Sequence, residues 1–339
     1  MNRSTKYITL AHGAGGRMTQ ELIREVFAAH FNNPVLARMN DAAVIAAQEE
    51  GRLAFSIDGH VVSPLFFPGG DIGELAVYGT VNDLAMMGAR PMWLAASFII
   101  EEGLEVAALK RIAKSMAEAA KRAGVQVVAG DTKVVERGKG DGVYISTAGV
   151  GVVPSHLDID AGNARPGDVI LLSGPIASHG MAIMLQREGL AFDSGLESDT
   201  APLYEIVARM LDAAPHTRSM RDATRGGLAT ALNELARASG VGMSIREEVI
   251  PMLEPARAAC ELLGLDPLYV ANEGVFIAIA PREEVDAALA ALRGHPLGAR
   301  AVRLGEVTDV RPGVVVMETP LGSQRVVTPL TGDLLPRIC

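Results

Sequence analysis

The chain ends in Pro336-Arg337-Ile338-Cys339, which places a thiol on its final residue. A cysteine on a free chain end, beside its own carboxylate, is hard to bury for packing, so its position favours a reactive group. The preceding residues, 328–335, include Pro, Gly and short polar side chains and lack the periodicity of a long helix. Fully extended, residues 329–339 span roughly 35 Å at about 3.3 Å per residue. A frayed terminus is the simpler interpretation, and the rest of the chain must decide between the two.

Five aspartates lie where an apolar segment meets a turn that contains Gly or Asn: Asp41, Asp58, Asp83, Asp131 and Asp222. Each one alone is ordinary, because aspartate is favoured in turns and caps. Together with loops that open helices they form a stronger pattern. Hard carboxylates bind Mg²⁺, which takes its remaining ligands from water and nucleotide phosphates, and phosphoryl transfer needs such positioning and charge neutralisation. The sequence therefore predicts a carboxylate-lined nucleotide site bridged by Mg²⁺.

Glycine-rich or polar loops precede three predicted helices, at residues 12–17, 178–180 and 220–227. Backbone N–H groups of such loops and the positive end of a helix dipole can hold phosphate. The first loop, His12 to Arg17, matches neither common phosphate-binding fingerprint, so a flexible turn is an equal interpretation. For His12, a solvated side chain is the alternative to a ligand.

The elements that must position these residues follow from apolar periodicity. In the first half, runs at 40–45, 53–60, 93–100, 125–129 and 143–153 predict strands, and 77–88 and 104–123 predict helices. Pro154 is a candidate domain boundary. In the second half, strands are predicted at 169–174, 275–280, 301–307 and 313–317, and helices at 181–187, 202–211, from 228 onward and at 283–292. Residues 193–200 are polar and predict a mobile loop. The alternation of strands and helices predicts an α/β (α+β) protein of two domains.

Composition excludes several classes of protein. The net charge is −9, with no basic run and few aromatic residues, which argues against nucleic acid or an anionic membrane as the main partner. The second cysteine, Cys260, lies in an apparent helix and is expected to be buried. The first ten residues lack the apolar core of a signal peptide, and no run approaches a membrane span. We expect a soluble cytoplasmic protein.

Five motifs together resemble the aminoimidazole-ribonucleotide-synthetase-like (PurM-like) ATP enzymes over almost the whole chain. They are His12-Gly13-Ala14-Gly15-Gly16, Val81-Asn82-Asp83-Leu84-Ala85-Met86-Met87-Gly88, Gly130-Asp131-Thr132-Lys133, Arg221-Asp222-Ala223-Thr224-Arg225-Gly226-Gly227-Leu228 and Asn272-Glu273-Gly274. With the terminal four residues added, the chain resembles the carbamoyl dehydratases of NiFe-hydrogenase maturation.

This resemblance implies a two-domain PurM-like ATP-binding fold. Residues 1–154 would be the ATP-binding and dimerisation domain, 155–318 a C-terminal α/β domain, and 319–339 a flexible tail that carries the reactive cysteine. Members of the family pair the sheets of their N-terminal domains and bind ATP near that interface, so we expect a homodimer.

The resemblance also implies a two-step use of ATP. A partner carbamoyltransferase, HypF, would load a carbamoyl group onto Cys339. Phosphorylation of the carbamoyl oxygen and elimination of phosphate would then leave a thiocyanate, whose cyanide passes to iron held by the HypC–HypD complex.

Residue roles follow by match to the family. Cys339 would carry the substrate, with Lys133 or Glu273 as the base; Lys133 as a phosphate counter-ion and Glu273 as a structural acid are the alternatives. Cofactor binding would fall to Gly13, Gly15, Gly16, Asp58, Asp131, Asp222, Thr224, Arg225, Gly226, Gly227 and Asn272. Asp41, Asp83 and Asp131 would hold Mg²⁺.

Two other functions remain open from the sequence. A selenophosphate synthetase or thiamine-phosphate kinase would share the acidic ATP site, although the former is expected to carry a reactive residue near the N-terminal glycine loop, and no Cys precedes Cys260. A nucleotide-binding carrier without dehydratase activity is the other. For Cys339 we expect the adjacent α-carboxylate to raise the thiol pKa, leaving the free thiol sluggish until a partner activates it.

Overall fold

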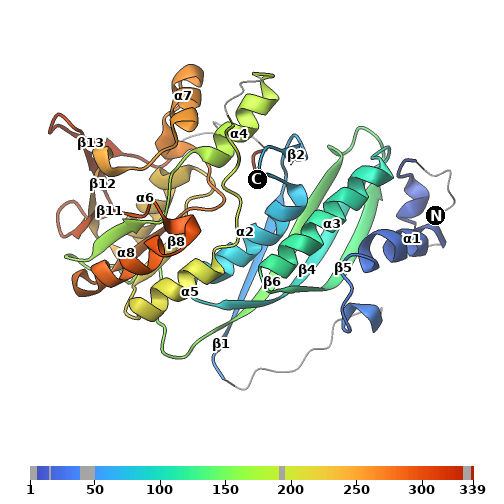
Figure 1. Ribbon diagram of the computed structural model, residues 1–339, viewed down its shortest axis with the longest axis horizontal. Coiled ribbons are helices and arrows are strands. Elements are labelled where there is room, and N and C mark those ends of the chain that lie inside the picture. Colours follow the sequence, from blue (N-terminus) through green and yellow to red (C-terminus); the bar gives the residue numbers. More distant parts are fainter. Residues whose placement is uncertain (1–5, 15–16, 39–49, 191–194, 331–336) are drawn as a thin grey trace.

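The computed structural model describes residues 6–14, 17–38, 50–190, 195–330 and 337–339 (Figure 1). Two sheets organise these residues, one in each half of the chain. The first has the strand order β1-β6-β4-β5 and the second β13-β12-β9-β11-β7-β10-β8. In the described part of the chain, no helix is both long enough and apolar enough to cross a membrane.

The first half begins with a short helix α1 (Arg17–Leu22), which continues as a wider helical turn to Ala28. The strands of the sheet and a small hairpin follow: β1 (Arg52–His60), β2 (Phe66–Phe67), β3 (Gly70–Asp71), β4 (Arg90–Glu101), β5 (Gln126–Val135) and β6 (Val143–Val153). Two helices cover one face of this sheet, α2 (Ile72–Met86) and α3 (Val106–Arg122) (Figure 1). The bounds of β6 are those predicted from the sequence, whereas α2 begins five residues before the predicted start at Val77, because Asp71 caps it by accepting hydrogen bonds from Gly73 and Glu74.

One face of the first sheet is covered by helices, and the other carries exposed side chains. Side chains of a strand alternate between faces, and on β1 the residues Ser56, Asp58 and His60 point toward α2. The side chains on the other face of β1 include Leu53, Phe55 and Ile57, which are 71%, 70% and 68% exposed. We call these the helix-covered face and the open face.

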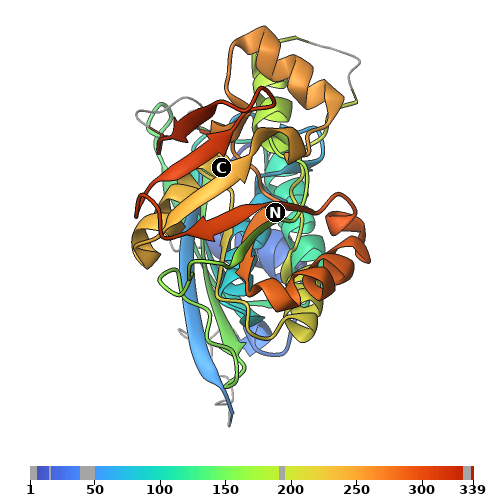
Figure 2. The same cartoon turned by 90° about the vertical axis from the view of Figure 1, so that its left-hand side faces the viewer.

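The second half contains the strands β7 (Val169–Leu172), β8 (Ser219–Asp222), β9 (Gly242–Arg246), β10 (Phe276–Ala280), β11 (Val302–Thr308), β12 (Val315–Glu318) and β13 (Gln324–Val327). Its helices are α4 (Ser178–Arg187), α5 (Tyr204–Ala213), α6 (Gly227–Ser239), α7 (Glu254–Leu263) and α8 (Val285–Arg293). Figure 2 shows the second sheet from its own side of the molecule. As expected, Cys260 is buried in a helix, on α7.

Helix α2 joins the cores of the two halves. It is apolar on nearly all sides, as expected of a helix with neighbours all round; its first part, including Leu75, packs in the first core, and its last turn, including Leu84, packs with α5 and α8. Residues carried by α2 therefore lie at the boundary between the two halves.

Two sequence-based expectations about local structure change, and a third is not tested. The strand predicted at 40–45 lies outside the described residues. Of the loop predicted to be mobile, residues 195–200 are packed: Leu196 is buried, and the Ser198 amide donates to the Pro68 carbonyl at 2.9 Å. Within the segment predicted as a free tail, β13 pairs with β12, because alternate apolar residues such as Val327 complete the second core.

Candidate active site

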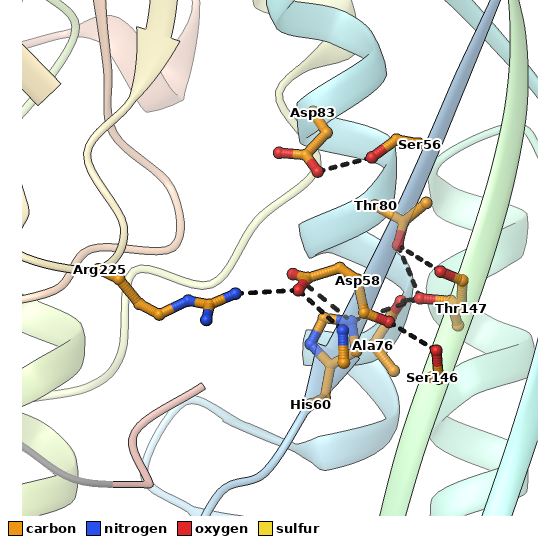
Figure 3. A network of polar contacts seen from close by, with 10 residues as sticks. Ser56, Asp58, His60, Ala76, Thr80, Asp83, Ser146, Thr147 and Arg225 are labelled. Carbon is orange, nitrogen blue, oxygen red and sulfur yellow. Dashed lines mark hydrogen bonds and ion pairs between the residues drawn. The ribbon is translucent and has the colours of Figure 1, made fainter. Parts of the chain in front are cut away.

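Two carboxylates of the first half, from β1 and α2, lie near an arginine of the second half at the helix-covered face (Figure 3). Asp58 on β1 accepts a hydrogen bond from Arg225 at 3.2 Å, although the two residues are far apart in sequence. Asp83 on α2 accepts one from the Ser56 hydroxyl at 2.7 Å. The structure therefore brings together two of the predicted aspartates and the predicted arginine.

His60 lies beside Asp58, with its Nε2 3.9 Å from an Asp58 carboxylate oxygen, and it also contacts a group of buried hydroxyls (Figure 3). The Thr147 hydroxyl donates to the Ala76 carbonyl at 2.8 Å, so its oxygen accepts from the Nε2–H of His60 at 3.3 Å. Burial lowers the pKa of His60 to about 4, which keeps the ring neutral. Sequence reasoning missed this network, because its members become neighbours only when β1, β6 and α2 are assembled.

The loop between β8 and α6 carries the next group of predicted residues, Asp222 to Gly227. Gly226 and Gly227 have φ of +73° and +60°, in the left-handed region that favours glycine. A Cβ on Gly227 would lie 2.5 Å from the Leu268 carbonyl oxygen, so a larger residue does not fit. Thr224 and Arg225 come immediately before these glycines and the N-terminus of α6, which is a favourable place for a phosphate.

Charge accumulates among the carboxylates of this site. Burial, and then the charge of Asp83, raises the pKa of Asp222 to about 7. Burial also raises the pKa of Asp83, and the nearby Asp58 adds to the effect. Like charges that raise each other's pKa are poised to bind a cation. Among the described residues, however, no three such side chains already stand in ligating geometry.

Glu273 lies deepest in the site. It is 3% exposed, and its Oε1 is a buried oxygen without a hydrogen-bond partner in the described structure. Burial, followed by the charges of Asp222 and Asp199, raises its pKa well above the ordinary value. A carboxyl group with a raised pKa is a stronger base once ionised, which suits proton abstraction.

Asn272 precedes Glu273 and fixes its backbone. Its amide oxygen accepts from the Ala177 N–H at 2.7 Å, and its amide nitrogen donates to the carbonyls of Ala223 and Val270 at 2.8 and 3.0 Å. These contacts use both polar groups of the side chain to hold three segments together. Contact of Asn272 with a nucleotide stays a prediction.

Cys339 is docked in this site rather than free. The Val61 N–H donates to a main-chain oxygen of Cys339 at 3.0 Å, and the Ser63 N–H donates to the Arg337 carbonyl at 3.2 Å. Ile338 is buried in the core of the first half. Figure 1 shows the C-terminal end between α4 and the β2 hairpin.

The environment of Cys339 raises its pKa far above the ordinary range, first through burial and then through the charge of Glu273. The predicted direction agrees with this, but the cause differs: burial, not the α-carboxylate, is the largest effect. Arg225 acts in the opposite direction, and Asp58 and Asp222 add to the increase. The thiol therefore lies within reach of the charges that form the carboxylate site.

Asp131 and Lys133 lie elsewhere, on the open face of edge strand β5. The register pairs them with Ser97 and Ile99 of β4, and Ile99 is exposed. Three strand spacings of about 4.8 Å separate β5 from β1, and Asp58 points to the opposite face. The Lys133 ammonium and the Asp131 carboxylate form an ion pair at 3.0 Å with each other. A single chain therefore does not bring Lys133 together with Glu273.

The N-terminal loop lies over the same edge strand. Gly13 packs so closely on Val134 that a Cβ would lie 2.8 Å from the Val134 nitrogen. His12 is fully buried and its Nδ1 accepts from the Thr9 amide at 3.0 Å, so the expectation of a solvated side chain is wrong. Three predicted site residues, Gly15, Gly16 and Asp41, lie outside the described residues.

Comparison with known proteins places the chain in a family. Residues 39–153 match the N-terminal domain, and residues 165–318 the C-terminal domain, of AIR synthase related proteins. The chain is 57% identical to carbamoyl dehydratase HypE of Cupriavidus necator, with 100% of this chain and 97% of the relative covered.

Solved structures agree with the sequence match. Hydrogenase maturation protein HypE in complex with ATP superposes with a TM-score of 0.94 at 47% identity, over 97% of this chain and 99% of the other. A chain from a HypE–HypF complex gives a TM-score of 0.80 at 44% identity, over 93% and 100%. A thiamine-monophosphate kinase from Stenotrophomonas maltophilia gives 0.68 at 19% identity over 92% and 98%, which shows a shared fold alone. The chain belongs to the AIR synthase related family and, within it, to the HypE carbamoyl dehydratases.

Proposed function

We propose that this chain is an ATP-dependent carbamoyl dehydratase that converts an S-carbamoyl group on Cys339 to a thiocyanate, the source of the cyanide ligand of NiFe-hydrogenase iron. One observation carries the proposal: the docked C-terminal residue places its thiol where the charges of Glu273, Asp58, Asp222 and Arg225 act on its pKa. A carrier that only presents its thiol to partners does not need to bind its C-terminal residues beside a carboxylate site.

The reaction balances without any external oxidant or reductant. The amide oxygen of the S-carbamoyl group is a poor leaving group, and transfer of the ATP γ-phosphoryl group to it makes it a good one. Loss of both protons from nitrogen, with departure of phosphate, then forms the carbon–nitrogen triple bond. The products are the thiocyanate on Cys339, ADP and phosphate.

Glu273 is the base that we assign to the nitrogen protons. Its charge acts on the thiol of Cys339, and its Oε1 has no internal partner in the described structure. Lys133 points to the open face of β5 and pairs with Asp131, which favours its alternative role as a phosphate counter-ion.

Mg²⁺ fits the residues present, because three carboxylates, those of Asp58, Asp83 and Asp222, lie close enough to raise the pKa of their neighbours. A bound cation would offset this negative charge. The bound ion would neutralise the phosphate charge. Of the residues predicted to bind it, Asp83 belongs to this group. Thr224, Arg225, Gly226 and Gly227 lie at the start of α6 and suit the phosphate groups of ATP.

A homodimer accounts for the open face. Leu53, Phe55 and Ile57 form an exposed apolar row, and soluble monomers rarely leave such a row uncovered. Packing of two open faces would cover it, as in other paired sheets, and would place Asp131 and Lys133 of each copy at the interface. We propose that a second copy completes the nucleotide site with these two residues and with Gly13.

The same proposal assigns the other partners and the domains. HypF would load the carbamoyl group and the HypC–HypD complex would accept cyanide, within the cytoplasm, where ATP is supplied. Residues 1–154 would be the ATP-binding and dimerisation domain and 155–318 the C-terminal domain. Residues 319–339 would be the thiol-bearing tail, of which β13 anchors the first part.

The decisive experiment starts from protein carbamoylated at Cys339 and purified away from its loading enzyme. Addition of ATP and Mg²⁺ should reduce the mass of the C-terminal peptide by one water, with stoichiometric formation of ADP and phosphate. Omission of ATP is the control. An unchanged peptide mass, with ATP bound, would leave a nucleotide-binding carrier in place of the enzyme.

A further inference from the structure

Helix α4 also binds the docked tail, in addition to residues 61–63. At the start of α4, the Nε2 of His179 lies 2.9 Å from the Ile338 carbonyl oxygen. At its end, the Arg187 guanidinium donates to the Arg337 carbonyl at 2.8 Å and to the Ser63 carbonyl at 2.7 Å. Consecutive carbonyl groups of the tail are therefore bound by the two ends of one helix.

The hydrogen bonds of His179 define its protonation. Burial lowers its pKa to about 4, so the ring is neutral and carries one N–H. A carbonyl oxygen can only accept, so that N–H is on Nε2 and donates to Ile338. Nδ1 then accepts from the Ser198 hydroxyl at 2.8 Å. The ring also packs edge-on against Phe67, with centroids 5.6 Å apart, which fixes its plane.

The loop that contains Ser198 also holds Glu273. The carboxylate of Asp199 accepts from the backbone N–H of Glu273 at 3.2 Å and of Gly274 at 3.0 Å. It also accepts from the backbone N–H of His179. One buried carboxylate thus joins the residue that binds the tail to the residue whose charge acts on the thiol.

A strained backbone position reinforces this link. Ala177, immediately before α4, has φ of +74°, a conformation that costs a non-glycine residue energy and that persists where surrounding contacts enforce it. Its N–H donates to the Asn272 amide oxygen, and the Gly180 N–H donates to the Ala271 carbonyl at 3.1 Å. The start of α4 is therefore tied to the Asn272–Glu273 segment at several independent points.

We propose that His179 is a positioning residue that fixes the thiol-bearing tail against Glu273, with Asp199 setting the relative position of the two. This deepens the proposed function and rests on it, because the register of the tail decides whether a group on Cys339 reaches the base. His179 itself does not touch the reacting atoms: it binds the carbonyl one residue before the thiol.

The first test measures the tail without ATP and so does not depend on dehydratase activity. The rate of Cys339 alkylation is followed by peptide mass spectrometry, with buried Cys260 as the internal reference. Loss of one buried hydrogen bond in His179→Ala should release the tail and raise the rate about tenfold. His179→Gln retains an N–H donor at a similar reach and should restore the rate to within about threefold of wild type.

Matched variants separate positioning from general damage. His216→Ala removes an exposed histidine and should leave the alkylation rate unchanged. Ser198→Ala removes the donor to Nδ1 and should raise the rate less than His179→Ala does; it carries the test if His179→Ala does not fold. Unchanged alkylation in both His179→Ala and Ser198→Ala, with melting temperatures near wild type, would overturn the inference.

The second test uses the carbamoylated protein with ATP and Mg²⁺. His179→Ala should lower the dehydration rate constant about tenfold or more while the apparent ATP affinity stays near wild type, and His179→Gln should recover most of the rate. If wild type itself forms no thiocyanate, the proposed function fails, and the alkylation result alone decides whether His179 holds the tail. Faster alkylation combined with undiminished dehydration would show that the tail contact does not position the thiol.

Discussion

The helix-covered face and the open face of the first sheet carry different residues of the predicted nucleotide site: Asp58 lies on the first and Asp131 on the second. The sequence alone predicts one site that contains both. On β1 the alternation is strict: Ser56, Asp58 and His60 point toward α2, and Phe55 and Ile57 point away. At the carboxylate site beside the covered face, burial and like charges shift pKa values strongly, as at Asp222 of β8. On the open face, Lys133 lowers the pKa of Asp131, and the pair is mostly exposed.

The two faces of the same strands therefore differ in what they can do. The covered face assembles its chemistry within a single chain, including the docked thiol. The open face offers an apolar row and an exposed ion pair, which gain a role once another molecule covers them. If a second copy covers the open face, Asp131 and Lys133 of one chain could complete the carboxylate site of the other.

The largest expected effect comes from the covered face. Glu273→Gln retains the shape of the side chain but removes the carboxylate that we propose as the base, so dehydration should slow by about 100-fold or more. Thiocyanate formation on carbamoylated protein is the measurement, and nucleotide binding should persist. Glu248→Gln, on an exposed glutamate, is the matched control. A Glu273→Gln enzyme that works within threefold of wild type would assign proton removal to another group.

The next test addresses the open face alone. Phe55→Glu introduces charges into the proposed sheet-to-sheet contact and should convert the dimer to monomer at micromolar concentration, because a buried unpaired charge is costly. Sedimentation velocity gives the molecular mass. Leu262→Glu, at an exposed leucine on α7, should leave the assembly unchanged. If Phe55→Glu sediments like wild type, some other surface pairs the copies, or the chain acts alone.

Sequence patterns were sufficient for much of this architecture. Apolar alternation predicted the bounds of β6, and the aspartates at element ends, such as Asp58 and Asp83, do lie in one site together with Arg225. Such residues could be recognised because each sits beside a local signal: a turn, a glycine pair or a helix start.

Local signals of this kind do not predict which residues far apart in sequence come into contact. The placement of Asp131 on the face opposite to Asp58 depends on the strand order β1-β6-β4-β5, which apolar periodicity does not determine. His179 contacts a carbonyl 159 residues away, and its only local signal is a Ser-His-Gly helix start. Asp199 looked like part of a polar mobile loop, yet it is held by the backbone of Glu273 and Gly274.

A mixing experiment sharpens the comparison directly. Asp83→Asn damages the covered face and Asp131→Asn the open face, and each homodimer should lose about tenfold or more in activity. If one site takes Asp83 from one copy and Asp131 from the other, a mixed dimer contains one intact site. Exchange of subunits should then restore roughly a quarter of wild-type activity, since half of the dimers are mixed and half of their sites intact. No gain on mixing would place both aspartates in the site of a single chain.

The smallest expected effect is the pH dependence of stability without ligand. The buried carboxylates beside the covered face and Asp131 on the open face should contribute to it with opposite sign. Burial raises the pKa of Asp222 to about 7 and that of Asp199 to about 6. A carboxyl with a raised folded-state pKa binds its proton more tightly when folded. Its stabilising effect is complete below the unfolded pKa of about 4 and is lost as the pH rises through the folded value. The melting temperature should therefore fall by several degrees between pH 5 and pH 8.

Asp222→Asn removes one of these protons and should flatten the profile measured by calorimetry at constant ionic strength. The pKa of Asp131 is lowered by its hydrogen bond to Lys133, so its contribution is lost only below about pH 4. Asp131→Asn should therefore give a profile parallel to wild type from pH 5 to pH 8. Mg²⁺ with ATP should raise the melting temperature more at pH 8 than at pH 5, because the ion binds the ionised carboxylates. If Asp222→Asn and Asp131→Asn gave the same slope, the covered face would hold its carboxylates no differently from the open face, and the electrostatic distinction between the two would fail.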